Sequence, residues 1–167
     1  MAGHNYSLIG VSTLLVTFVL LSSAPHFCVS CILLLNGWAP LSVGERTDLA
    51  DIVAVGRALR SFKDQRTPDS NTYTAQFVFL SVPKGSRHLQ QIPYDTIAME
   101  TGLTRYNVTN FGDRNACYAD VTDGEEYVIF MTMFERHLSA KYDDLFGALQ
   151  ERTREAEEEV YEALGMT

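Results

Sequence analysis

The sequence predicts a mainly β fold, a small barrel or sandwich of five strands, with an amphipathic C-terminal helix and an N-terminal signal peptide. Three observations predict it. Five segments rich in β-branched and aromatic residues are separated by polar turns, the apolar period lengthens after residue 142, and residues 1–44 contain no Asp, Glu, Lys or Arg. A length of 167 residues with 46% hydrophobic and 20% charged residues is typical of one globular domain.

The first two strands are expected over residues 52–62 and 72–82. The first is rich in β-branched residues, although a helix beginning near residue 49 is an alternative. The second follows the turn-forming sequence Pro-Asp-Ser-Asn and alternates polar and apolar residues. These two segments are the first of the five expected strands.

Three further strands are expected over residues 89–99, 103–110 and 126–134. Pro93 interrupts the first of them, which predicts an edge position because proline has no N–H to donate. The last is the strongest strand in the sequence and is entered through Asp123-Gly124. Five strands separated in this way favour a small closed β fold.

A helix is expected over residues 143–164, within a C-terminal segment of residues 143–167. Apolar residues fall along one stripe at spacings of four and seven, namely Leu145, Leu149, Ala156, Val160 and Leu164. The stripe either covers the barrel or contacts a partner helix, and Leu149, Ala156, Val160 and Leu164 are the candidate partner-binding residues. The rest of this segment is acidic.

Charge excludes one class of partner. The formal net charge is −8, from 21 acidic and 13 basic residues, whereas nucleic-acid binding requires clustered Lys and Arg. Residues 143–167 hold eight acidic and two basic side chains, so most of the negative charge lies on the predicted helix.

The front of the chain has the features of a targeting segment. Residues 8–35 are mostly apolar, and the first half has the length of a signal-peptide core. Small side chains at Cys28 and Ser30 place the expected cleavage after Ser30, so that residues 1–30 form the signal peptide. The alternative is an uncleaved anchor, because about 20 apolar residues suffice to span a bilayer.

The cysteine count agrees with cleavage. Removal of Cys28 leaves Cys31 and Cys117 as an even pair in an oxidising compartment, where a disulfide is expected. A bridge closing a loop of about 86 residues is worth roughly 4 kcal/mol in the chain-entropy description. The alternative, a zinc or redox pair formed by Cys28 and Cys31, lacks a second ligand pair.

Catalytic motifs are absent from the sequence. It has no His-Glu-x-x-His, Gly-x-Ser-x-Gly or phosphate-binding glycine loop, and we expect no catalytic, cofactor-binding or metal-binding residues. Asn107-Val108-Thr109 is an N-glycosylation sequon, which a secreted chain can use at Asn107.

An ordered set of short motifs carries a resemblance to a known family. The motifs are Ala-Asp-Ile-Val-Ala-Val-Gly at residues 50–56, Asn-Thr-Tyr-Thr at 71–74, Pro-Lys-Gly at 83–85, Asn-Phe-Gly-Asp at 110–113 before Cys117, and Asp-Gly-Glu-Glu-Tyr-Val-Ile-Phe at 123–130. Over about residues 31–164 the chain resembles the netrin-module and tissue-inhibitor superfamily, most closely the N-terminal agrin domains. The resemblance implies a five-stranded OB-fold-like barrel over residues 31–142.

The resemblance also implies a function. Agrin-type domains are secreted, non-enzymatic modules of the basement membrane that bind the coiled-coil arm of laminin, and the Cys31–Cys117 pair matches their single bridge. The tissue inhibitors imply metalloprotease inhibition through the amino group of a mature Cys31. Residues 38–44 look similar to favine-like secreted signalling proteins, a third alternative.

Overall fold

A computed structural model describes residues 39–63, 71–93, 97–100, 103–114, 117–142 and 147–166. These residues belong to one compact unit, residues 31–167. The predicted signal peptide, residues 1–30, and Cys31 lie outside the described residues.

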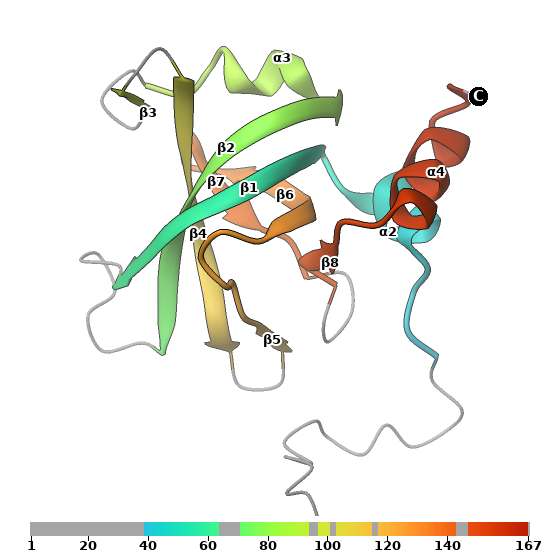
Figure 1. Ribbon diagram of the computed structural model, residues 1–167, viewed down its shortest axis with the longest axis horizontal. Coiled ribbons are helices and arrows are strands. Elements are labelled where there is room, and N and C mark those ends of the chain that lie inside the picture. Colours follow the sequence, from blue (N-terminus) through green and yellow to red (C-terminus); the bar gives the residue numbers. More distant parts are fainter. Residues whose placement is uncertain are drawn as a thin grey trace, which may run out of the picture. The chain divides into compact units, whose positions relative to one another are not determined.

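Five strands close into a barrel (Figure 1). They are β1 (Ile52–Lys63), β2 (Thr72–Lys84), β4 (Leu103–Arg114), β6 (Glu126–Phe134) and β7 (His137–Ala140). β1 pairs with β2 and β6, β2 with β4, and β6 with β7, all antiparallel, while β4 and β7 pair in parallel. The closed order β1-β2-β4-β7-β6 with one parallel pair confirms the OB-fold-like barrel.

Short elements extend and cover this barrel. β3 (Ile97–Glu100) and β5 (Cys117–Ala119) both pair with β4, and β8 (Leu149–Glu151) pairs with β6. The helices are α2 (Val43–Leu49), α3 (Ser86–Leu89) and α4 (Arg154–Ala163). α4 confirms the expected C-terminal helix.

The strongest sequence patterns gave the best boundaries. β6 has the expected bounds, and β1 and β2 extend past theirs by one and two residues. The helix considered from residue 49 onward is wrong, because Ile52 begins β1. The expected strand over residues 89–99 is wrong at its start, because α3 and a turn lie there, and only β3 forms, as an edge strand on β4.

The C-terminal helix is shorter than expected. α4 begins at Arg154, where the Thr153 side chain caps it by accepting a hydrogen bond from the Ala156 N–H at 3.1 Å. Leu149 does not lie on the helix, because the chain around it pairs with β6 as β8. Residues 143–146 lie outside the described part of the chain.

The barrel interior is a single apolar core. Its largest fully buried side chains come from β1, β2, β4, β6 and β7, among them Ile52, Phe77, Phe111, Met131 and Leu138. The rings of Phe77 and Phe111 lie 5.9 Å apart at a tilt of 55°. This core fixes which side of each strand faces outward.

Motif glycines lie where distant chain segments approach one another. Gly85 has φ +74°, and a Cβ built there would lie 2.3 Å from the Asp51 carbonyl oxygen. Gly112 has φ +94°, and its Cβ would lie 2.5 Å from the Asn71 carbonyl oxygen. Four of the motifs quoted above therefore contact one another in pairs in the folded chain.

Two glycine substitutions distinguish the cost of a steric clash with a neighbouring segment from the cost of positive φ alone. Gly124 has nearly the same φ, +92°, but a Cβ there would meet nothing within 4 Å. We expect Gly124→Ala to lower the free energy of unfolding by about 1 kcal/mol. Gly112→Ala should lower it by about 3 kcal/mol, because the Asn71 backbone must also move. Urea denaturation measures both, and equal losses would contradict the close approach.

Candidate partner-binding face

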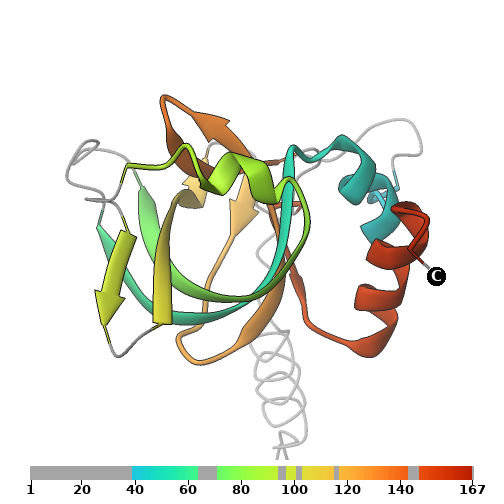
Figure 2. The same cartoon turned by 90° about the horizontal axis from the view of Figure 1, so that it is seen from above.

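A second apolar cluster lies outside the barrel. Val53 and Val55 of β1 and Val128 and Phe130 of β6 point away from the interior, yet all four are at most 2% exposed. The helices α2 and α4 cover them, contributing Val43, Ala156 and Val160, with Ala50 just after α2. Figure 2 shows the two helices side by side against this part of the barrel. We call α2 and α4 the helix pair.

Arg46 of α2 is buried inside this assembly, at 7% exposed. Its Nε donates to the Ser42 carbonyl at 3.3 Å, Nη1 to the Leu149 carbonyl at 3.3 Å, and Nη2 to Gln150 Oε1 at 3.0 Å. The guanidinium also lies 4.9 Å from the centre of the Phe130 ring. One side chain thus joins α2 to β8 and β6.

Two further contacts hold α2, a helix of seven residues that is too short to be stable alone. Ser42 and Glu45 form a capping box at its first turn. At the other end, Lys84 Nζ donates to the carbonyls of Thr47 and Asp48 at 2.8 and 2.9 Å. The cation lies at the negative end of the helix, which is the favourable end.

The four candidate partner-binding residues have different positions. Ala156 and Val160 are 5% and 1% exposed and pack in the second cluster, so they hold α4 on the barrel. Leu164 is half-buried beside the same cluster, and Leu149 is half-buried on β8 against the barrel core. A partner of α4 therefore has to contact other side chains of this helix.

The outward side of α4 is acidic. Glu155, Glu158 and Glu162 are exposed, and their spacing of three and four residues places them on one face. Arg154 pairs with Glu158 at 3.3 Å, both largely exposed. Glu159 instead accepts a hydrogen bond from the Gly44 N–H at 3.3 Å, which joins α4 to α2.

An ionic row runs from the barrel to α4. Arg57 Nη2 lies 2.5 Å from Glu126 Oε1, Arg152 Nη1 lies 2.6 Å from Glu126 Oε2, and Arg152 Nε also pairs with Glu157. Hydrogen bonds from Arg152 and then from Arg57 hold the pKa of the Glu126 carboxyl below its usual value. We call these four residues the ionic row.

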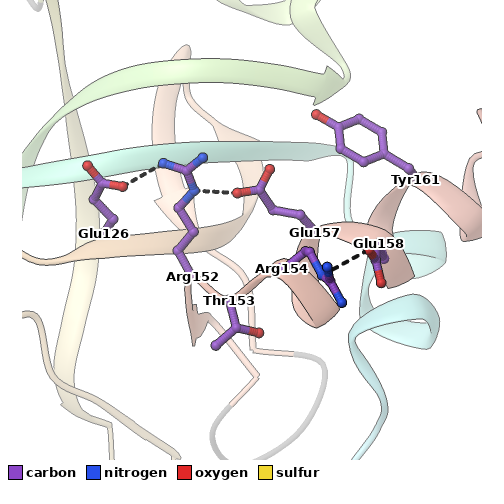
Figure 3. Close-up of a pocket in the computed structure, with 7 residues that line it drawn as sticks. All are labelled: Glu126, Arg152, Thr153, Arg154, Glu157, Glu158 and Tyr161. Atoms are coloured by element: carbon purple, nitrogen blue, oxygen red, sulfur yellow. Dashed lines mark hydrogen bonds and ion pairs between the residues drawn. The ribbon is translucent and has the colours of Figure 1, made fainter.

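The ionic row borders an open hollow of about 540 Å³ between β6 and the first turns of α4 (Figure 3). The hollow is lined by Glu126, Arg152, Thr153, Arg154, Glu157, Glu158 and Tyr161. In Figure 3, Arg152 reaches between Glu126 and Glu157. Sequence reasoning missed Arg57 and Glu126 because they become neighbours only when β1 pairs with β6.

The sequon lies in the sheet rather than on a loop. Asn107 is half-buried on β4, and its Oδ1 accepts a hydrogen bond from Gln76 Nε2 at 3.1 Å. Thr109 Oγ1 donates to the Leu138 carbonyl at 3.1 Å. Glycosylation at Asn107 stays a prediction, as does the Cys31–Cys117 disulfide, since Cys31 lies outside the described residues.

Within the described ranges, no group of three or more His, Cys, Asp or Glu side chains is placed to hold a metal ion. No helix in that part of the chain is long and apolar enough to cross a membrane.

No protein-family model matches the sequence, and no curated protein is similar to it.

The buried guanidinium of Arg46 gives a test of how the helix pair is held. Arg46→Lys keeps the charge, but its single nitrogen cannot reach the three acceptors that Nε, Nη1 and Nη2 contact, so we expect a loss of about 2–4 kcal/mol of unfolding free energy. Arg154→Lys, at a largely exposed pair, should change it by less than about 0.5 kcal/mol. Thermal denaturation of both variants measures the difference, and similar small losses would argue against Arg46 as the main tie.

Glu126 gives a pH test. Its pKa is lowered in the folded state, so the stability it contributes is present above its unfolded pKa, near 4.5, and is lost as the pH falls through the folded pKa. The difference in unfolding free energy between wild type and Glu126→Gln should therefore shrink as the pH is lowered from 7 through this range. Urea denaturation across that range measures it, and a constant difference would contradict the ionic row.

Proposed function

We propose that this chain is a secreted, non-enzymatic extracellular-matrix module of the basement membrane that binds the coiled-coil arm of laminin. The observation that carries the proposal is the helix pair, fixed on the outer wall of an OB-fold-like barrel with one face of α4 free for a partner. The sequence motifs that resemble the agrin-type domains support the same assignment.

The proposed contact is the acidic face of α4. Glu155, Glu158 and Glu162 form one row, and half-buried Tyr161 lies on the same helix. Coiled coils carry rows of Lys and Glu beside their apolar seam. A row of carboxylates complements the basic positions of such a surface and speeds association.

Rigidity favours this face as a docking surface. Ala156 and Val160 anchor α4 in the second cluster, Glu159 ties it to α2, and Arg46 ties α2 to the barrel. A preformed surface avoids the cost of ordering a segment on binding. Because the apolar stripe of α4 is buried, the acidic face points outward in one fixed orientation.

The ionic row supports a fixed position for α4. Hydrogen bonds from Arg152 and Arg57 stabilise the ionised carboxylate of Glu126 and lower its pKa. In this hollow the charges pair with one another, which suits a structural tie between β6 and α4.

Charge reversal on α4 tests the proposal. Glu158→Lys with Glu162→Lys should lower the association rate with a recombinant laminin coiled-coil fragment about tenfold at low salt, because electrostatic attraction becomes repulsion. Biolayer interferometry at two salt concentrations measures the rate and its salt dependence.

The matched control is Glu125→Lys, which changes an exposed carboxylate in the turn before β6 and leaves α4 intact. It should bind like the wild type. Absence of binding by the wild-type chain would contradict laminin recognition, and equal rates for all variants would contradict the acidic face.

A further inference from the structure

The β6–β7 hairpin has an unusual turn. Phe134 pairs with His137, which leaves a two-residue connection of Glu135 and Arg136. Both residues have positive φ, 47° and 66°. This is the geometry of a type I′ turn, in which Asn-Gly and Asp-Gly are the favoured sequences because they tolerate positive φ.

Glu135 and Arg136 are poor choices for such a turn. The Cβ of an L residue crowds its own backbone at positive φ, and long side chains gain no local hydrogen bond in exchange. Strained residues of this kind cluster at binding sites and switch regions. The hairpin tip, Glu135 and Arg136, therefore carries a backbone cost that Asn-Gly or Asp-Gly would avoid.

Phe134 stands beside the strained turn. At 65% exposed, it has the highest exposure among the large apolar side chains that the structure describes. Met133, its neighbour in β6, packs against the barrel core, so Phe134 points to the outside. Figure 2 shows this hairpin rising beyond the rest of the barrel.

The tip lies on the same side of β6 as the residues under the helix pair. Glu126, Val128, Phe130 and Phe134 have the same parity along the strand, and Val128 and Phe130 lie beneath the helices. Eight residue steps separate Glu126 from Phe134, or about 27 Å along an extended strand. Because α4 packs over Val128 and Phe130, and Phe134 lies further along the same side of β6, an elongated partner is suited to contacting both α4 and the hairpin tip.

We propose that Phe134, Glu135 and Arg136 form a second contact with the coiled-coil partner, with the ring of Phe134 entering an apolar groove between helices. This inference rests on the proposed function. One acidic and one basic side chain flank the ring, which matches the mixed Glu and Lys rows that border a coiled-coil seam. A membrane is the poorer fit, because one ring buries little area and a chain of net charge −8 is repelled by anionic lipid.

Three variants test the tip, again by biolayer interferometry with the laminin coiled-coil fragment. Phe134→Ala should weaken binding at least tenfold, mainly through faster dissociation, with an unchanged melting temperature, because an exposed aromatic anchors the interface but not the fold. Leu80→Ala is the matched control, since Leu80 is 49% exposed on β2, and it should bind like the wild type.

The double variant Glu135→Asn, Arg136→Gly tests separately whether the turn is strained and whether its two charged side chains contribute to binding. It should raise the melting temperature by about 5 °C because the turn now has favoured residues, and should weaken binding because the flanking charges are lost. An unchanged or lower melting temperature would contradict the claim that the wild-type turn is strained. Wild-type affinity would contradict a role of the two charges in binding.

Wild-type affinity in Phe134→Ala, measured while the wild-type chain binds the fragment, would overturn this inference and leave the proposed function standing. A wild-type chain that does not bind the fragment would remove both. Equal losses of affinity in Phe134→Ala and Leu80→Ala would show that exposed apolar area contributes to binding wherever it lies. That result would also overturn this inference.

Discussion

The guanidinium of Arg46 is the contact on which the arrangement of the helices depends. It lies in a mostly apolar cluster, where a charge is costly unless every donor is used. Carbonyl oxygens of Ser42 and Leu149, the Gln150 amide and the face of Phe130 supply the compensation. Leu149, Gln150 and Phe130 lie far from Arg46 in the sequence, so this side chain fixes α2 against β8 and β6.

This dependence connects the core to the proposed binding face. α2 supplies Val43 to the cluster that buries Ala156 and Val160, and without α2 the inner side of α4 would be partly uncovered. The orientation of the acidic face of α4 thus follows from packing on its opposite side. The ionic row adds a second tie, from Glu126 on β6 through Arg152 to Glu157 on α4.

Particular elements show how far the sequence could be interpreted. β2 and β6 were predictable because alternation and flanking turns act over a few residues. β7 and β8 have only four and three residues, too few for a period to be visible. α2 was missed, although Ser42 and Glu45 carry the capping-box spacing that could have indicated it.

The ionic row and the strained tip could not be found in the same way. Arg57 and Glu126 meet through strand register, and the positive φ of Glu135 and Arg136 is imposed by the strands on either side. Neither residue pair follows a local sequence preference. Each arrangement exists because strand pairing fixes where the backbone runs.

The sequence by itself determined the mainly β class, the positions of the long strands along the chain and the acidic character of the C-terminal helix, because period and charge are local properties. Only the tertiary structure decided that Leu149 joins a strand, that Ala156 and Val160 face the barrel, and that α4 begins at Arg154. An apolar stripe predicts that one face of a helix will be buried, but it does not identify the surface that buries it. The covering surface is assembled from β1, β6 and α2, which lie far away in the chain.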